Sequence, residues 1–233
     1  MKKKILISTG GSGGHVIPAL GIYEHLRNNF ETFITTDIRG SKFIDSNKFD
    51  FNIIDIPNLQ NNLFKIPLNI MLLIISIVKS LIFFKKKKIN VIISTGGYMS
   101  LPICLLSQLF NTKLYLFEPN MVIGRSNLFL IKYCSKIFCY SNEIKKFPSK
   151  YQNKLKLINP ILNKNSYLVK KKVFSNVSKK KNILIIGGSQ GANYFQTQLK
   201  EFLINLSEKF QIFVYHQTND INFEVLKKFY EDN

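Results

Sequence analysis

The sequence predicts an α/β protein with two Rossmann-like halves, each built on a parallel sheet and both facing one cleft. Short β-rich apolar runs alternate with longer helical stretches along the 233 residues, which is typical of parallel sheets. A glycine-rich loop follows an apolar run at residues 10–15, and a different one follows another apolar run at 187–193. Only about two β-α units fit after residue 182, so the second half is expected to be incomplete.

Each element follows from a local pattern. The first strand, 4–8, lies behind the N-terminal lysines, and the first helix, 16–28, carries Pro18 at a favoured early position. Further β-rich apolar runs predict strands at 32–36, 51–54, 91–94, 113–117, 136–139 and 155–157. Longer stretches between them predict helices at 67–84, 99–109 and 124–133. In the second half, the same patterns predict strands at 182–186 and 211–215 and a helix at 193–207.

The domain boundary is expected in the stretch 163–181, which is polar, rich in lysine and without periodicity, as linkers are. It joins a first domain at 1–162 to the truncated start of a second at 182–233. The N-terminal lysines resemble the start of a signal peptide, but the apolar run behind them is only about three residues, which is too short.

The net charge of +19 suggests a nucleic-acid partner, but only three of the 33 basic residues are arginine: Arg27, Arg39 and Arg125. Base and phosphate recognition favours arginine's bidentate fork, so no nucleic acid is expected. Lysine better suits an anionic membrane surface. The three cysteines, Cys104, Cys134 and Cys139, lack metal-ligand spacing and indicate a reducing compartment such as the cytosol.

Residues 66–78 form a charge-free run that continues to Phe84 and then meets four lysines, 85–88. It is interrupted by Pro67, Asn69 and Lys79, so it is not expected to span a membrane, which takes about 18 apolar residues. Two interpretations stay open: a helix packed on the sheet, or a helix whose outward face lies in the bilayer interface, anchored by the lysines. The helix is apolar nearly all round, which keeps the second interpretation open.

The first glycine-rich loop ends in His15. Glycine permits the turn and lets backbone N–H groups approach a phosphate. A dinucleotide fingerprint is matched only in part, because its third glycine position holds Val16, although Asp37 lies near the place of a ribose-binding acid. His15 is expected just before the helix, in the crevice where an imidazole can accept a proton from an alcohol. A structural role in capping the loop is the alternative.

Two further motifs follow predicted strands. The segment 95–98 follows the strand at 91–94 and offers backbone donors and an aromatic platform, or simply a tight turn. Glu118 and Asn120 follow the strand at 113–117, where a carboxylate and an amide suit hydrogen bonds to sugar hydroxyls. A salt bridge or a capping role is the alternative for this pair.

Five motifs occur here in the order seen in one family. They are residues 10–15, 95–98, Glu118 with Asn120, 159–160, and 187–193, which reads GGSQGAN. Residues 215–217, Tyr-His-Gln, are similar to a histidine–glutamine pair of the same family. On these residues, and over essentially its whole length, the chain resembles the bacterial peptidoglycan N-acetylglucosaminyltransferases that convert lipid I to lipid II.

The resemblance implies a GT-B type fold, with two Rossmann-like parallel-sheet domains facing a cleft. The first domain would bind the membrane-borne acceptor lipid I (undecaprenyl-diphosphate-MurNAc-peptide), and the second would bind UDP-GlcNAc. The C4 hydroxyl of MurNAc attacks C1 of the donor sugar with inversion, and UDP leaves. The product, lipid II, serves peptidoglycan synthesis and thereby cell shape and division. The resemblance implies no metal, since helix ends and backbone donors can stabilise the leaving diphosphate, and no cofactor besides the donor substrate.

The resemblance also implies a place and partners. The enzyme would be peripheral on the cytoplasmic face of the bacterial inner membrane, with UDP-GlcNAc, lipid I and the anionic membrane surface as partners and other cell-wall enzymes as further candidates.

Residue roles follow from the same resemblance. His15 is the expected general base, with Glu118 as the competing candidate, and Asn120 is expected to bind the donor sugar. Residues expected to line the acceptor side are Ser12, Gly13 and Gly14, with Gly96, Gly97 and Tyr98 beside them. Residues expected to reach UDP are Ser189, Gln190 and Gly191.

Two departures from the family pattern keep alternatives open. Leu162 stands where the family carries an arginine after Asn-Pro, which leaves room for a related UDP-sugar transferase acting on another lipid or glycan. The chain also stops before the family's later donor-binding segments, which leaves room for a non-catalytic, membrane-associated acceptor-binding fragment.

Overall fold

The computed structural model describes residues 2–55, 66–162, 181–187, 195, 198–218 and 222–232. The chain divides into two compact units, Met1–Val169 and Lys170–Asn233. Each unit is described by itself below.

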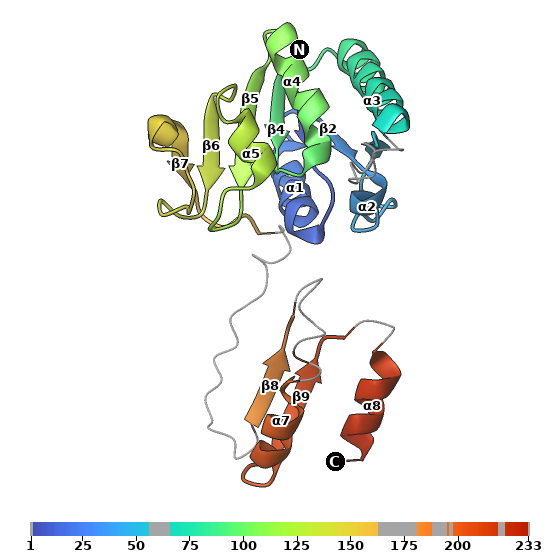
Figure 1. Ribbon diagram of the computed structural model, residues 1–233, viewed down its shortest axis with the longest axis vertical. Coiled ribbons are helices and arrows are strands. Elements are labelled where there is room, and N and C mark those ends of the chain that lie inside the picture. The colour runs from blue at the N-terminus through green and yellow to red at the C-terminus, as the bar shows by residue number, and fades with distance from the viewer. Residues whose placement is uncertain are drawn as a thin grey trace. The chain divides into compact units, whose positions relative to one another are not determined.

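The first unit contains a seven-stranded parallel sheet in the order β3-β2-β1-β4-β5-β6-β7 (Figure 1). Its strands are β1 (Lys4–Ser8), β2 (Glu31–Thr36), β3 (Phe51–Ile53), β4 (Val91–Ser94), β5 (Lys113–Glu118), β6 (Lys136–Cys139) and β7 (Leu155–Leu157). All seven were predicted, within one residue at each end. The chain moves outward from β1 to β3 and then returns to place β4 on the other side of β1. Ligands of open α/β sheets bind at such a switch point, outside the carboxyl ends of the strands.

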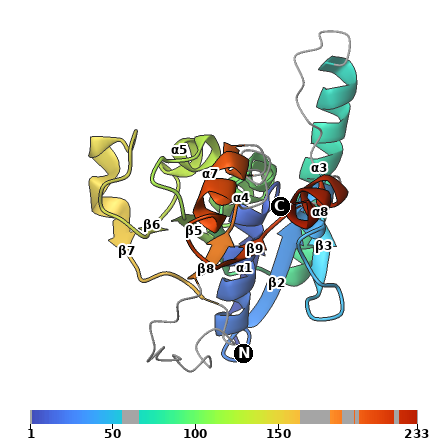
Figure 2. The same cartoon turned by 90° about the horizontal axis from the view of Figure 1, so that it is seen from below.

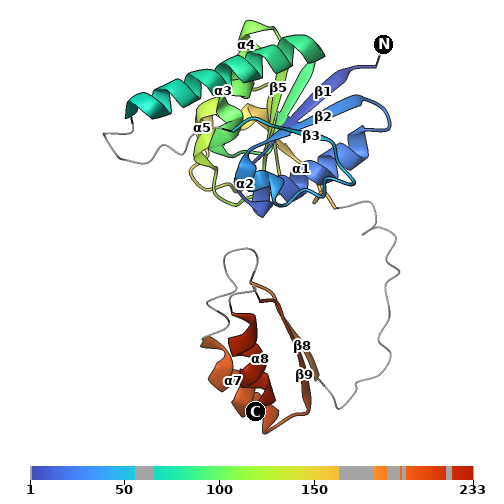
Figure 3. The same ribbon diagram turned by 90° about the vertical axis from the view of Figure 1, so that its right-hand side faces the viewer.

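Helices cover both faces of this sheet. They are α1 (Gly13–Leu26), α2 (Ile38–Ser41), α3 (Ile66–Lys87), α4 (Leu101–Leu109) and α5 (Arg125–Leu130), with 3-10 turns η2 (Tyr98–Ser100) and η3 (Ser149–Lys154). Along β1, Ile5 and Ile7 pack with α1 residues on one face, whereas Leu6 packs with residues of α3, α4 and α5 on the other. Figure 3 shows α1 and α2 on one side of the strands and α3 and α4 on the other.

Two differences from the predicted helices bear on the site. Helix α1 begins at Gly13, three residues earlier than predicted, so His15 lies within its first turn and not before it. Glycine has a low helix propensity, and here the packing of Val16 and Ala19 outweighs it. The short α2 was not predicted; Asp37 caps it by accepting a hydrogen bond from the Gly40 N–H.

Helix α3 carries large apolar side chains on its outer surface. It lies at the β3 side of the sheet, away from β7, and packs beside α4 (Figure 2). Two small polar residues, Ser76 and Ser80, are buried on its inner face, where their hydroxyls donate to backbone carbonyls. The exposed apolar residues of this helix are Leu68, Ile70, Met71, Leu72, Ile74, Ile75, Ile77, Val78 and Ile82. Helix α3 therefore carries more apolar surface than the sheet buries.

No helix in the described parts of the chain is long and apolar enough to cross a membrane. Helix α3, with 22 residues, includes the lysines of its last turn.

The second unit contains two parallel strands, β8 (Lys181–Ile185) and β9 (Ile212–His216), and two helices, α7 (Lys200–Ser207) and α8 (Phe223–Glu231). Both strands were predicted to within one residue. The amphipathic helix α8 was not predicted, and it buries Leu226. Residues 163–180, most of the expected linker, and 188–194, most of the second glycine-rich loop, lie outside the described residues.

Candidate functional site

The carboxyl ends of β1, β4 and β5 bring three predicted motifs of the first unit together. The β1 and β4 loops touch: a Cβ added to Gly97 would lie 3.0 Å from the Gly10 carbonyl oxygen. They are also tied by the Thr95 hydroxyl, which donates to the Thr9 hydroxyl at 2.8 Å. A Cβ added to Gly96 would lie 3.6 Å from Nδ2 of Asn127, which in turn binds Glu118. The segments after β1, β4 and β5 therefore form one continuous cluster.

The turn after β1 is fixed by a hydrogen bond to the Asp37 carboxylate. Gly11 adopts φ +83, and its N–H donates to Asp37 Oδ1 at 2.8 Å. Asp37 is buried, and it also accepts from the Gly40 N–H and from Arg39 Nε. The hypothesis that Asp37 binds a ribose is wrong, because its carboxylate is occupied by its own chain.

The N-terminus of α1 presents free backbone donors. The N–H groups of Gly13 and Gly14 have no acceptor among the described residues, as expected for the first turn of a helix. The N-cap residue Ser12 makes no side-chain capping hydrogen bond. These three predicted residues therefore offer two N–H groups and one hydroxyl at the positive end of a helix.

His15 is held by the β4 loop. Its Nδ1 lies 2.7 Å from the carbonyl oxygen of Thr95. A carbonyl oxygen only accepts hydrogen bonds, so Nδ1 carries the proton and Nε2 is the unprotonated nitrogen of the neutral ring. This contact, across 80 positions of sequence, leaves Nε2 as a hydrogen-bond acceptor.

Positions 96 and 97 after β4 require glycine because of their backbone angles and their close neighbours. Gly96 and Gly97 adopt φ +99 and +86, which disfavour any other residue. A Cβ at position 96 would lie 3.0 Å from Cε1 and Nδ1 of His15. These two glycines therefore let the β4 loop approach both the histidine ring and the first loop.

Gly96→Ala is expected to lower activity more than stability. The positive φ costs about 1–3 kcal/mol in folding free energy, whereas displacement of the His15 ring should lower turnover about 100-fold, since small misplacements are costly in catalysis. Thermal melts and transfer assays measure the two effects. On a His15→Ala background the glycine change should cost no further turnover; an additive loss would contradict this coupling.

Arg39 was not predicted as a site residue, and it supports Tyr98. Its Nη2 donates to the Tyr98 hydroxyl at 2.7 Å, and its guanidinium lies 5.0 Å from the Tyr98 ring centroid. Its Nε pairs with Asp37 at 3.2 Å. The signal in the sequence is an arginine two positions after an acid at a strand end, but the partner Tyr98 is 59 positions away.

Removing Arg39 is expected to raise the pKa of Tyr98. Burial already raises this pKa, and the positive charge of Arg39 opposes that effect, while the Asp37 charge adds to it. The Arg39→Ala variant loses the opposing charge, so the phenol should ionise at higher pH. A titration of the tyrosine ring signals by NMR measures the change, and Tyr98→Phe identifies the signal. A downward shift or no shift would show that the contact is absent in solution.

Glu118 does not have the surroundings of a general base. It is fully buried at the end of β5, and four uncharged N–H donors surround its carboxylate. Oε1 accepts from N and Nδ2 of Asn120 at 3.1 and 2.9 Å. Oε2 accepts from N of Gly124 at 2.8 Å and Nδ2 of Asn127 at 2.9 Å. The Glu118 carboxylate therefore has no free lone pair on an accessible oxygen, which argues against Glu118 as the competing base.

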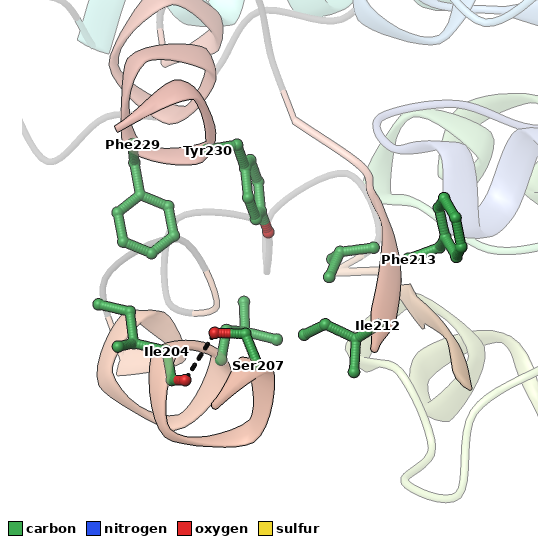
Figure 4. A pocket seen from close by; sticks show the side chains of 8 residues that line it. Ile204, Ser207, Ile212, Phe213, Phe229 and Tyr230 are labelled. Atoms are coloured by element: carbon green, nitrogen blue, oxygen red, sulfur yellow. Dashed lines mark hydrogen bonds between the residues drawn. The ribbon is translucent and has the colours of Figure 1, made fainter. Parts of the chain in front are cut away.

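In the second unit, His216 Nδ1 lies 2.9 Å from the Tyr230 hydroxyl, and burial lowers the pKa of His216. Tyr230 also lines an apolar cavity of about 400 Å³ beside α7, β9 and α8 (Figure 4). The predicted residues Ser189, Gln190 and Gly191 lie outside the described residues.

Within the described residues, no group of three or more His, Cys, Asp or Glu side chains could hold a metal. The three cysteines are free and buried, and burial raises the pKa values of Cys104 and Cys139 to about 12. Their thiols are therefore protonated at neutral pH and are poor nucleophiles.

The fold and site together define a Rossmann-like α/β protein with a glycine-rich turn and a histidine at its topological switch point. The family described as "Glycosyltransferase family 28 N-terminal domain" matches residues 5–139, and the chain belongs to this family.

Two curated relatives carry the same name, UDP-N-acetylglucosamine–N-acetylmuramyl-(pentapeptide) pyrophosphoryl-undecaprenol N-acetylglucosamine transferase. The protein from Pelagibacter ubique is 53% identical over 232 residues, which is 100% of this chain and 65% of the relative. The protein from Francisella tularensis subsp. holarctica is 33% identical over 241 residues, which is 99% of this chain and 64% of the relative. The chain thus spans just under two thirds of the length of these relatives.

Solved structures agree on the fold. The crystal structure of Acinetobacter baumannii MurG matches with a TM-score of 0.71 at 22% identity, over 99% of this chain and 65% of that one. A UDP-GlcNAc 2-epimerase from Methanocaldococcus jannaschii matches with a TM-score of 0.63 at 12% identity, over 97% of this chain and 68% of that one.

Proposed function

We propose that this chain belongs to an inverting glycosyltransferase that moves GlcNAc from UDP-GlcNAc to the C4 hydroxyl of MurNAc in lipid I, forming lipid II. The observation that carries the proposal is the His15–Thr95 hydrogen bond at 2.7 Å, which leaves Nε2 free to take a proton from a hydroxyl. The names of the two curated relatives, which include the Pelagibacter ubique protein at 53% identity, support the choice of substrates.

The acceptor diphosphate is proposed to lie at the N-terminus of α1. The N–H groups of Gly13 and Gly14, which have no acceptor among the described residues, the Ser12 hydroxyl and the helix dipole all favour an anion there. His15, in the first turn of the same helix, then lies close to the sugar attached to that diphosphate. Gly96, Gly97 and Tyr98 border this position from the β4 loop.

The donor is proposed to bind mainly to the second domain. On this proposal the first domain comprises residues 1–162. Residues 163–181 form the linker, and residues 182–233 form the start of the donor domain. Ser189, Gln190 and Gly191 would contact UDP, and Asn120 would contact the donor sugar from the first domain. No metal or cofactor is invoked, because the developing charge on UDP can be stabilised by helix ends and backbone donors.

The membrane contact is proposed to be helix α3, on a peripheral protein at the cytoplasmic face of the inner membrane. Its exposed apolar residues form a surface suited to the bilayer interface, and its last turn carries Lys85, Lys86 and Lys87. The charge of +19 across the chain favours anionic lipids over neutral ones. Lipid I in that leaflet would lie within reach of the first domain.

A second candidate is a membrane-associated module that binds the acceptor without catalysing transfer. The observation that favours it is that the features suited to binding, the exposed apolar residues of α3 and the N–H groups of Gly13 and Gly14, all lie in the first unit. A related transferase acting on another lipid or glycan is the remaining alternative, supported by Leu162 in place of an arginine.

The test is transfer of radiolabelled GlcNAc from UDP-GlcNAc to lipid I in vesicles by the purified chain. Transfer to lipid I, and not to an unrelated lipid-linked sugar, would support the proposed enzyme. Binding to lipid I vesicles without transfer would support the non-catalytic module. Transfer only to other acceptors would point to the related transferase.

A further inference from the structure

The proposed function assigns no role to the carboxylate of Glu118, which lies at the centre of the cluster after β5. It is buried, ionisable and surrounded by neutral amide donors, and two of its four hydrogen bonds go to Asn120. An ionised carboxylate offers about four acceptor positions, so these bonds fill it. Hydrogen bonds to a charged acceptor are roughly twice as strong as neutral ones.

The loop between β5 and α5 is built around this carboxylate. The N–H groups of Asn120 and Gly124 bind opposite oxygens, so the loop wraps over Glu118 and covers it. Glu118 is therefore inaccessible to a substrate hydroxyl, whereas Asn120, which lies on the loop, is exposed.

The side-chain amide of Asn120 can face Glu118 in only one way. Its Nδ2 donates to Glu118 Oε1 at 2.9 Å, and the flipped amide would instead place its oxygen against a carboxylate oxygen. The two atoms of a planar amide point in different directions, so Oδ1 is turned away from Glu118. No described residue donates a hydrogen bond to this Oδ1.

We propose that Glu118 is a positioning residue that fixes the Asn120 amide with its oxygen outward, so that Asn120 selects a hydrogen-bond donor of the substrate. The group selected would be a hydroxyl or an acetamido N–H of the donor sugar, an assignment that rests on the proposed function. Asparagine alone presents either end of its amide to a ligand, and the Glu118 contact removes that ambiguity.

A loss of activity in a Glu118 variant has two possible causes, because Glu118 is also linked to His15. Oε2 binds Asn127, and Asn127 lies beside Gly96, which touches the His15 ring. A Glu118 change can therefore disturb the proposed base as well as Asn120. Asn120→Ala, at an exposed position, avoids this problem, and Asn47→Ala, at another exposed asparagine, is the matched control.

The kinetic test compares Glu118→Gln, Asn120→Ala and the double variant in the transfer assay. Asn120→Ala should lower kcat/KM for UDP-GlcNAc about tenfold, as for a lost hydrogen bond. Glu118→Gln should lower it at least as much, and the double variant should be no worse than Glu118→Gln. The pH dependence of kcat/KM should keep its shape in both single variants, and the control Asn47→Ala should leave kcat/KM unchanged.

A general base at Glu118 would give a different result. Glu118→Gln would then remove the acidic limb of the pH profile, where kcat/KM falls as the base is protonated, while Asn120→Ala left kcat/KM unchanged, and the proposal would be overturned. Multiplying losses in the double variant would also overturn it, because the two residues would then act separately.

A second measurement does not depend on turnover. In an NMR spectrum of the whole chain, the Asn120 side-chain N–H signal should exchange slowly with water, and it should lose this protection in Glu118→Gln. The Asn47 signal should exchange quickly in both proteins. A fast-exchanging Asn120 signal in the unchanged protein would overturn the positioning role. Absence of transfer with a protected Asn120 signal would instead count against the proposed function and leave the positioning role supported.

Discussion

His15→Ala is expected to lower transfer of GlcNAc about 10²–10⁴-fold, the usual contribution of a general base. The reason is the hydrogen bond between Nδ1 and the Thr95 carbonyl, which fixes the tautomer with an unprotonated Nε2. The side chain is only half-buried, so its loss should change the melting temperature by no more than a few degrees. Steady-state transfer kinetics and thermal melts measure the two quantities.

A matched variant separates the chemistry of the ring from its packing. In His15→Asn, the side-chain N–H can still donate to the Thr95 carbonyl, but the amide oxygen is too weak a base to take the proton. Turnover should therefore fall as far as in His15→Ala, while stability returns toward that of the unchanged protein. If both variants lose stability heavily and keep turnover per folded molecule, the histidine has the structural capping role instead.

The second large effect is expected for helix α3. The double variant Ile70→Asp/Ile74→Asp places two charges on a face where both isoleucines are more than half exposed. Burial of one large aliphatic side chain contributes about 1.5–3 kcal/mol. If each isoleucine buries about half of its side chain in the lipid, loss of both should lower binding to vesicles at least 10-fold. Vesicle flotation with anionic lipids measures the partition, and the melting temperature should be nearly unchanged because the inner face of α3 is intact.

Leu157→Asp, at an exposed position of the edge strand β7, is the matched control and should bind vesicles as the unchanged protein does. Lys85→Gln/Lys86→Gln should weaken binding to anionic vesicles but not to neutral ones, and added salt should mimic this change. Lys87 is left in place because its ammonium lies 4.6 Å from the Phe33 ring centroid. Equal binding by the isoleucine variant and the control would contradict the membrane role of α3.

Strands were the most predictable part of this protein. A buried parallel strand such as β4 or β6 is a short run of β-branched and aromatic residues, and this signal is contained within a few neighbouring positions. Helix starts were less predictable. Helix α1 begins at Gly13 despite the low helix propensity of glycine, because packing of Val16 and Ala19 against the sheet stabilises the helix. The four-residue α2 depends on one cap at Asp37 and has no periodicity to detect.

Residue patterns alone predicted the positions of the strands along the chain, the glycine turns after β1 and β4, and the candidate residues at the strand ends. These features are local, since each depends on a short apolar run followed by residues suited to a turn. The sequence also determined the apolar character of α3, although not which of its faces is exposed.

The tertiary structure decided what each candidate can do. The proton position on His15 depends on Thr95, and the support of Tyr98 depends on Arg39, at separations of 80 and 59 positions. Glu118 changed from a candidate base to a buried acceptor because the loop that follows β5 folds back over it. Hydrogen-bond partners and burial arise from packing between distant segments, and no local pattern of residues encodes them.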